Sequence, residues 1–314
     1  MRPLLLALAF LVACPTSPDD DDSATPEEPT PEPTPSPMED LFSFVIIADP
    51  HIAGPAAHED RLRVAVDWVN DNAGAEGIEL VVVLGDIGWG SGLETSRTLL
   101  EGLEVPWAPI IGDNVLHSSG DAAFAEMFAE PLEELASVVD EYDAAPMPVW
   151  DERLGEDAWF QGIRFTWKGV RFVGVDWNIR HLSGNLAEFG DFNDVPGGSW
   201  EWLEDSLQDA ATRPEESILL LSHVPMLPAV FSVAEREQFA TLLAPIRDRV
   251  FGNLAGHLHI DVVEEYPEEG YVTWVTDATW DDMNAIRVVR VQGNEVARGY
   301  EQEVVELPEA PEGR

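Results

Sequence analysis

Apolar runs and amphipathic segments alternate along the chain beyond its first forty residues. The runs at 42–48, 78–84 and 109–111 are almost wholly apolar, which is typical of strands buried on both faces. Between them, residues 57–70 and 93–103 carry apolar side chains at the spacing of a helix that packs along one side. Strands and helices that alternate in this way predict a layered α/β fold.

The rest of the chain continues with segments of both kinds. Two short strands joined at Lys168-Gly169 predict a hairpin over residues 164–176. We expect one domain over residues 41–300, followed by an acidic tail at 301–314. Further helices are predicted at 121–140, 199–210 and 233–248, and further strands at 217–222, 250–256 and within 271–299.

The N-terminal residues have a different composition, which predicts export. Arg2 precedes an apolar stretch, Leu4–Val12, that is too short to span a bilayer and is typical of a signal peptide over residues 1–13. The sequence that ends at Cys14, LVAC, resembles a bacterial lipoprotein signal, which implies that this cysteine carries the lipid. An ordinary signal peptide with an incidental cysteine is the alternative.

Residues 14–40 are expected to form a tether behind that lipid. Residues 15–40 contain eight prolines, nine acidic residues and no basic residue, a composition that cannot form a core. The resemblance therefore implies a protein that is exported and held by lipid in the bacterial cell envelope, at either membrane. Because Cys14 is the only cysteine, a disulfide within the chain is excluded.

The charge of the chain narrows the choice of partners. There are 60 acidic and 17 basic residues, which give a net charge of -43. A field of this sign repels nucleic acid and anionic membrane surfaces. We therefore expect no nucleic-acid partner, and contact with a membrane only through the N-terminal lipid. The sequence leaves the oligomeric state open.

Acidic residues and histidines follow five of the predicted strands. In open α/β sheets, ligands bind beyond the carboxyl ends of the strands, so we expect these side chains to share one crevice. The chain has only seven histidines, and four of them stand at these positions. The residues are Asp49 and His51, Asp86, Asp113, His223, and the pair His257 and His259.

Each of these motifs has an ordinary explanation when it is taken alone. Asp49-x-His51 and Gly85-Asp86 are common at turns and caps, and a lone His223 is usually a hydrogen-bonded core residue. Gly-His-Leu-His is more specific, because strand alternation places His257 and His259 on one side. Taken together and in this order, the motifs indicate a metal site.

The physical chemistry of such a cluster favours two metal ions. Three carboxylates packed closely repel one another, so we expect their pKa values to rise unless cations lie between them. Mixed oxygen and imidazole ligands suit iron, manganese or zinc. Seven ligands are too many for one tetrahedral ion, but they suit two ions that share a carboxylate.

The order of motifs resembles that of the calcineurin-like metallophosphoesterase superfamily, which includes purple acid phosphatases and many phosphodiesterases. The superfamily pattern is Asp-x-His, Gly-Asp, Gly-Asn-His, a lone His and Gly-His-x-His, and four of the five blocks match over residues 42–300. The resemblance implies a β-sandwich flanked by helices, with the metals at the carboxyl ends of the strands. It also implies hydrolysis of phosphate mono- or diesters, with a metal-bound hydroxide as the nucleophile.

The resemblance assigns the ligands residue by residue. It implies two ions from among iron, manganese and zinc, without indicating which. One ion would be held by Asp49, His51 and His259, and Asp86 would bridge both. The second ion would be held by His223 and His257, with Asp113 standing where the family has asparagine.

One block departs from the family pattern. Gly112-Asp113-Asn114 replaces Gly-Asn-His, so Asn114 stands where the family has a histidine that contacts phosphate or protonates the leaving group. An amide donates a hydrogen bond but supplies no proton, and His58 or His117 could substitute for the missing histidine. The departure supports an alternative function, a non-catalytic or weakly active metal-binding domain that acts as a surface binding module.

Three tryptophans follow predicted strands: Trp89, Trp177 and Trp280. They either line a pocket or pack in the core.

Overall fold

The computed structural model describes most of the chain from Ser36 onward. The predicted signal peptide, Cys14, most of the predicted tether and His117 lie outside the described residues. The described ranges are 36–116, 120–145, 148–153, 155–180, 189–280, 284–294 and 297–309.

The first of two large sheets has five strands in the order β14-β13-β1-β2-β3. Strands β1, β2 and β3 run parallel, β13 is antiparallel to β1, and β14 is antiparallel to β13. Their bounds are Glu39–Ala48 for β1, Ile78–Leu84 for β2, Trp107–Ile110 for β3, Ala285–Gly293 for β13 and Arg298–Glu306 for β14.

The second sheet has seven strands in the order β11-β12-β10-β9-β8-β7-β4. Its central strands β8, β9, β10 and β12 are parallel, and β7 and β8 form the predicted hairpin. The bounds are Glu141–Ala144 for β4, Ile163–Trp167 for β7, Val170–Gly174 for β8, Ser217–Leu221 for β9, Val250–Ala255 for β10, Val262–Tyr266 for β11 and Tyr271–Val275 for β12. A separate small hairpin is formed by β5, Val149–Asp151, and β6, Glu156–Ala158.

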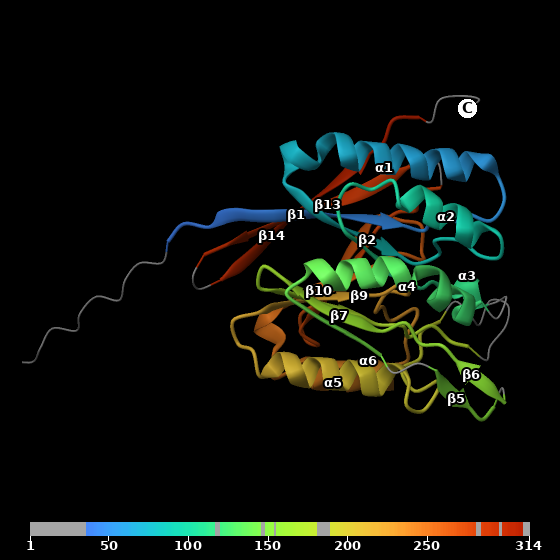
Figure 1. Cartoon of the computed structure of the whole chain (residues 1–314). Helices are drawn as coiled ribbons and strands as arrows, with labels where there is room; N and C mark the ends of the chain where they lie inside the picture. The colour runs from blue at the N-terminus through green and yellow to red at the C-terminus, as the bar shows by residue number, and fades with distance from the viewer. Residues whose placement is uncertain are drawn as a thin grey trace, which may run out of the picture. The chain divides into compact units, whose positions relative to one another are not determined.

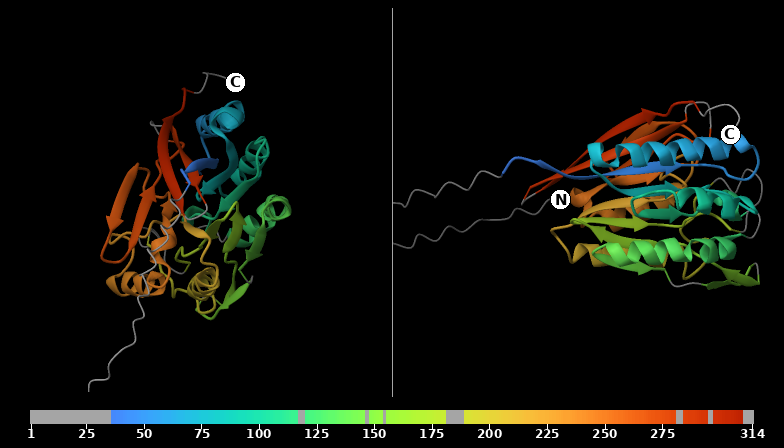
Figure 2. Two further views of the ribbon diagram at one scale, coloured as in Figure 1. Left: turned by 90° about the vertical axis from the view of Figure 1, so that its left-hand side faces the viewer. Right: turned by 45° about the horizontal axis from the view of Figure 1, so that its top comes forward.

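Helices cover both sheets (Figure 1). Helices α1, α2 and α4, coloured blue to green, lie side by side in one layer in the right panel of Figure 2. Helices α5 and α6 pack on the second sheet. The bounds are Ala56–Glu76 for α1, Gly92–Leu100 for α2, Asp113–Leu116 for the short α3, Asp121–Val138 for α4, Ser199–Ala211 for α5 and Val233–Leu243 for α6.

The alternation of side chains along β1 explains why the sheets are layered. Val45 and Ile47 pack with α1, α2 and α4, whereas Phe44 and Ile46 face the second sheet. Phe44 meets Phe172 of β8 edge to face, at 5.3 Å between ring centroids. A strand that is apolar at every position therefore serves two interfaces, and the predicted β-sandwich flanked by helices is confirmed.

The predicted acidic tail is wrong in its first part. Residues 301–306 belong to β14, which pairs with β13 along its whole length. The exposed acids Glu301 and Glu303 alternate with half-buried Gln302 and Val304, which is the period of a strand. Charged side chains on such an edge strand discourage pairing with another chain.

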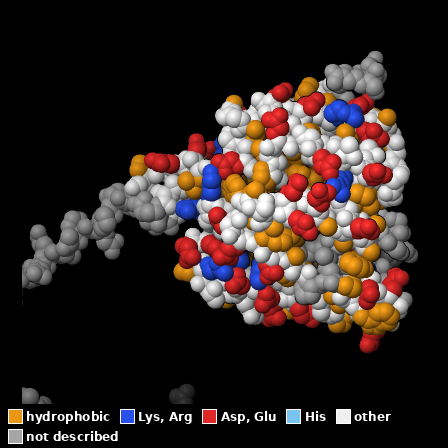
Figure 3. Space-filling model, in the orientation of Figure 1, with side chains coloured by type: hydrophobic (Ala, Val, Ile, Leu, Met, Phe, Trp, Pro, Cys, Tyr) orange, Lys and Arg blue, Asp and Glu red, His pale blue; other side chains and the backbone are white. Residues whose placement is uncertain are grey.

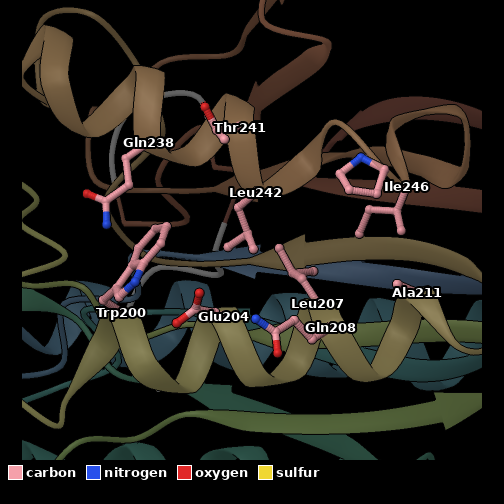
Figure 4. A pocket seen from close by; sticks show the side chains of 10 residues that line it. Trp200, Glu204, Leu207, Gln208, Ala211, Gln238, Thr241, Leu242 and Ile246 are labelled. Atoms are coloured by element: carbon pink, nitrogen blue, oxygen red, sulfur yellow. The ribbon is translucent and has the colours of Figure 1, made fainter.

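The described surface is acidic, as the composition requires. Acidic side chains are spread over the face shown in Figure 3, with far fewer basic ones among them. Among the described residues, no helix combines the length and the apolar character that crossing a membrane requires. A cavity of about 530 Å³ lies between α5 and α6, lined by Trp200, Leu207, Leu242 and other residues of these helices (Figure 4). None of the predicted metal ligands lines it.

Candidate metal centre

All seven predicted ligands lie just beyond the carboxyl ends of parallel strands. Asp49 directly follows β1, Asp86 follows β2, and Asp113 begins α3 after β3. His51 also follows β1, whereas the other three histidines come from the second sheet, with His223 after β9 and His257 and His259 after β10. The structure brings them into three groups with ligand atoms within 4.8 Å of one another: Asp49, His51 and His259; Asp113, His223 and His257; and Asp49, Asp86 and His223.

The first group converges on one carboxylate oxygen. Oδ1 of Asp49 lies 3.7 Å from Nε2 of His51 and 3.5 Å from Nε2 of His259. The Asp49 side chain is fully buried, and its two oxygens accept hydrogen bonds from the backbone N–H of His257 at 3.1 and 2.9 Å. The carboxylate is therefore held in place from the opposite sheet.

The second group is tighter. Oδ1 of Asp113 lies 2.8 Å from Nε2 of His223 and 3.1 Å from Nδ1 of His257, and the two ring nitrogens are 3.3 Å apart. Oδ2 of Asp86 lies 3.5 Å from Nε2 of His223 and 3.2 Å from Nε2 of His51. One oxygen of Asp86 thus contacts a histidine from each group, which is the position that the bridging assignment requires.

The tautomer of His223 is set by the main chain. Its Nδ1–H donates to the carbonyl oxygen of Leu84 at 3.0 Å. Nε2, which faces Asp86 and Asp113, is then the nitrogen that a metal ion can bind once it has lost its proton. Metal-binding histidines are commonly oriented by a bond of this kind to the other ring nitrogen.

Two glycines permit the close approach of these elements. A Cβ atom on Gly85, which has φ of +77°, would lie 2.2 Å from Nδ1 of His223. A Cβ atom on Gly112 would lie 2.1 Å from the backbone nitrogen and from Oδ1 of Asp86. The Gly-Asp pairs of the sequence therefore have a steric origin, since a larger residue would displace a neighbouring ligand.

The backbone is strained where it carries the ligands. Among the described residues, seven other than glycine have positive φ, and five of these are predicted ligands. This conformation is uncommon in residues with a side chain, and it concentrates at functional sites because the surrounding structure must enforce it. The five are Asp49, His51, Asp86, His257 and His259, with φ between 43° and 73°.

The electrostatics differ from the expectation for three crowded carboxylates. Burial alone would raise the pKa of Asp86, but the charge and hydrogen bonds of His223 and His51 hold it well below its usual value. Burial would also raise the pKa of Asp113, but hydrogen bonds from His223 and His257 lower it to about 2. The pKa of Asp49 is also lowered, by His223, His259 and His51 against the effect of burial. The predicted rise is wrong because the histidines provide positive charge.

The histidines show the converse effect. Burial lowers the pKa of His51, but the neighbouring carboxylates of Asp49 and Asp86 raise it to about 9. The pKa of His223 is raised well above its usual value by the charges of Asp86 and Asp49, although burial opposes this. The carboxylates therefore require positive charge between them, and protons on histidine or metal cations can supply it.

The residues fit metal binding. Nε2 of His51 is buried and has no hydrogen-bond partner among the described residues, although it points at two carboxylates. Carboxylate oxygens and imidazole nitrogens together match the preferences of iron, manganese and zinc.

Asn114 is directed at Asp86. Its backbone N–H donates to Oδ1 of Asp86 at 3.0 Å, and its side-chain Nδ2 donates to Oδ2. Of the two histidines considered as substitutes, His117 lies outside the described residues. His58 donates from Nδ1 to the carbonyl oxygen of His51 at 2.9 Å.

The three tryptophans have different surroundings. Trp177 is fully buried in the core and donates to the carbonyl oxygen of Val224. Trp280 stacks on His51 and Trp89 meets the same ring edge to face, at 5.3 and 5.4 Å between centroids. Two tryptophans therefore pack on a predicted ligand, and their positions after strand ends were the only signal of this.

Comparison with solved structures gave a match that agrees with this fold. The chain is similar to a putative 5'-nucleotidase from Staphylococcus aureus, with a TM-score of 0.50 and 12% identity, over 87% of this chain and 55% of that one. It therefore spans about half the length of that protein. Vacuolar protein sorting 29 from Cryptosporidium parvum and Vps29 from Chaetomium thermophilum are each 11% identical, with TM-scores of 0.27 and 0.26. These two matches cover 85% of this chain and 100% and 98% of theirs.

Comparison with curated protein sequences gave no match. The model of one protein family, described as calcineurin-like phosphoesterase, matches residues 42–261, which include all seven predicted ligands. Together with the two packed sheets and the ligand groups at their strand ends, this match shows that the chain belongs to the calcineurin-like phosphoesterase family.

Proposed function

We propose that this protein hydrolyses phosphate esters at a dinuclear metal centre formed by the seven clustered residues. The observation that carries the proposal is the position of Asp86, whose Oδ2 lies 3.2 Å from His51 and 3.5 Å from His223. A carboxylate between two sets of histidine and aspartate ligands is the arrangement that two neighbouring ions need. Membership of the phosphoesterase family supports the class of reaction.

The residues would divide between two ions, and Asp86 would serve both. Asp49, His51 and His259 would hold the first ion, and Asp113, His223 and His257 would hold the second. Two such ions supply Lewis-acid chemistry, by which they bind the phosphoryl oxygens and activate the attacking water. The protein's own contribution is to orient the ligands: Leu84 fixes the tautomer of His223, and the backbone of His257 fixes Asp49.

The chain's departure from the family pattern affects which ester leaving groups the site can expel. Asn114 has no proton to transfer, and its amide is engaged by Asp86. General acid catalysis contributes about 10²–10⁴-fold, so esters with poor leaving groups lose most when it is absent. We therefore propose a preference for esters whose leaving groups are stable anions, such as aryl phosphates.

The chain leaves open whether monoesters or diesters are the substrates. The Staphylococcus aureus protein is described as a putative 5'-nucleotidase, but at 12% identity it supports the fold alone. Both ester classes therefore belong in the test.

The test is hydrolysis of p-nitrophenyl phosphate and of bis(p-nitrophenyl) phosphate with added Mn²⁺, Zn²⁺ or Fe²⁺. We expect metal-dependent turnover of at least one ester and two bound ions per chain, and we expect His257→Ala to lose most of the turnover and one of the two ions. Two bound ions without hydrolysis of any ester would favour the alternative, a non-catalytic metal-binding domain. A chain that binds no metal would contradict the proposal.

We further propose that the chain is exported and lipid-anchored through Cys14, as its N-terminal sequence implies. Expression in a bacterial host with an alkyne-labelled fatty acid tests this. Label should enter the wild-type protein and be absent from Cys14→Ser. Equal labelling of both proteins, or of neither, would contradict lipidation.

A further inference from the structure

One buried arginine connects the two sheets close to the metal centre. Arg287 lies on β13 opposite Ile46 of β1, three residues before Asp49. Its side chain is only 2% exposed, and it reaches from the first sheet to the end of the second. Nη2 donates to the carbonyl oxygen of Val275 at 2.8 Å, and Nε donates to Oγ1 of Thr276 at 2.9 Å.

The same guanidinium pairs with Asp261, in the loop that carries two predicted ligands. Nη2 of Arg287 forms an ion pair with Oδ1 of Asp261, two residues after His259. His257 has an anchor of its own, because its backbone N–H donates to both oxygens of Asp49. The His259 side chain is 29% exposed, and its backbone has the strained φ of 51°. The Asp261 ion pair therefore restrains the part of the loop that carries His259.

The second segment held by Arg287 leads to Trp280. This segment starts at Val275 and Thr276, and the backbone of Thr279 donates to the carbonyl oxygen of Ala48, next to Asp49. Trp280 then packs on both histidines of the first group, stacked on His51 and edge-on to His259, each at 5.3 Å between ring centroids. Arg287 is thus attached to both segments that border the first ion site.

We propose that Arg287 is a positioning residue for the metal ion held by Asp49, His51 and His259. The inference rests on the dinuclear centre proposed above. The second ion site should depend on it less, because His223 is oriented by Leu84 and His257 by Asp49. A planar guanidinium with several donors suits this task, since it contacts a carboxylate, a carbonyl and a hydroxyl at once.

The direction in which one substitution changes the metal affinity distinguishes a positioning role from a purely electrostatic one. Arg287→Met removes a positive charge near the centre, which by Coulomb's law alone would strengthen cation binding. The positioning role predicts the opposite, namely weaker binding at one of the two sites. Interactions that orient metal ligands are typically worth 10–100-fold in metal affinity, so we expect a loss of about tenfold or more.

The experiment is titration of the metal-free full chain with Mn²⁺, followed by calorimetry and by elemental analysis after dialysis. Wild type should bind two ions, and Arg287→Met and Asp261→Ala should each weaken one of them. Glu303→Ala is the matched control, because Glu303 is an exposed acid that pairs with another β13 arginine, Arg290, at 2.9 Å. It should bind both ions as wild type does.

The side chain of Asp261 is 41% exposed, so Asp261→Ala should fold even if Arg287→Met does not. Because Asp261→Ala removes an acid, as Glu303→Ala does, only a selective weakening of one ion supports positioning. Three outcomes would overturn the inference and leave the proposed function standing. Asp261→Ala could bind both ions with unchanged affinity, its affinity for both ions could fall equally, or Glu303→Ala could show the same loss. Tighter binding by folded Arg287→Met would also overturn it. A wild-type chain that binds no metal would overturn both.

Discussion

Replacing Gly85 by alanine tests whether the glycine before Asp86 maintains the metal centre. Gly85 has φ of +77°, and an added Cβ would meet Nδ1, Cγ and Cβ of His223 at 2.2, 2.3 and 2.5 Å. The left-handed conformation costs a residue with a Cβ about 1–2 kcal/mol. Forcing an extra methyl group into a packed core costs about 1–3 kcal/mol more. We therefore expect Gly85→Ala to lower the free energy of unfolding by roughly 2–5 kcal/mol.

Gly77→Ala is the control, because Gly77 has the similar φ of +64° but open space where the Cβ would go. It should lose only the conformational part, about 1–2 kcal/mol, and should keep the full metal content. Urea unfolding of the metal-free proteins measures the first effect, and elemental analysis measures the second. If the two variants were equally stable and bound equal amounts of metal, the steric reasoning would be refuted.

Three further predictions concern the metals and the departure from the family pattern. In the metal-free protein, protonated His51 stabilises the fold at low pH, and this stabilisation is lost as the pH rises through its pKa of about 9. A metal ion that binds His51 must displace the proton from its ring. The gain in melting temperature at a fixed concentration of Mn²⁺ should therefore grow between pH 6.5 and 9, and a constant gain would contradict this. A concentration of 100 times Kd corresponds to a stabilisation of about 2.7 kcal/mol per site. Asp113→Asn should reduce the Mn²⁺ content and lower the pH optimum of hydrolysis, because it removes one of three carboxylates. If neither the metal content nor the pH optimum changed, Asp113 would be excluded as a metal ligand. Asn114→His should raise turnover of alkyl phosphates more than aryl phosphates, by up to about 10²-fold, and equal effects on both would exclude general acid catalysis.

The clustering of the seven candidate ligands could be predicted because each of them follows closely after the end of a strand. Asp49 and Asp86 follow apolar runs that are easily recognised as buried strands, and strand order then places them at one edge. The layers were predictable for the same reason, since continuous apolar runs require cover on both faces.

The remaining features depend on contacts between distant residues. The hydrogen bonds of Asn114 with Asp86 join residues 28 apart, and the ion pair of Arg287 with Asp261 joins residues 26 apart. Residues 301–306 were misjudged because their charge is conspicuous, whereas their alternation becomes meaningful only beside β13. The pKa values of the carboxylates were misjudged because the neighbouring histidines were considered only as ligands and not as charges.

The positive φ angles of the ligands have a consequence for the stability of this fold. Strained backbone of this kind costs of order 1–3 kcal/mol at each position, so the metal centre opposes the stability of the domain that carries it. Glycine adopts this conformation without a steric cost, so replacing a ligand by glycine would remove the strain together with the ligand. The strain at these five positions is therefore a cost that the fold bears in order to hold the candidate ligands close together.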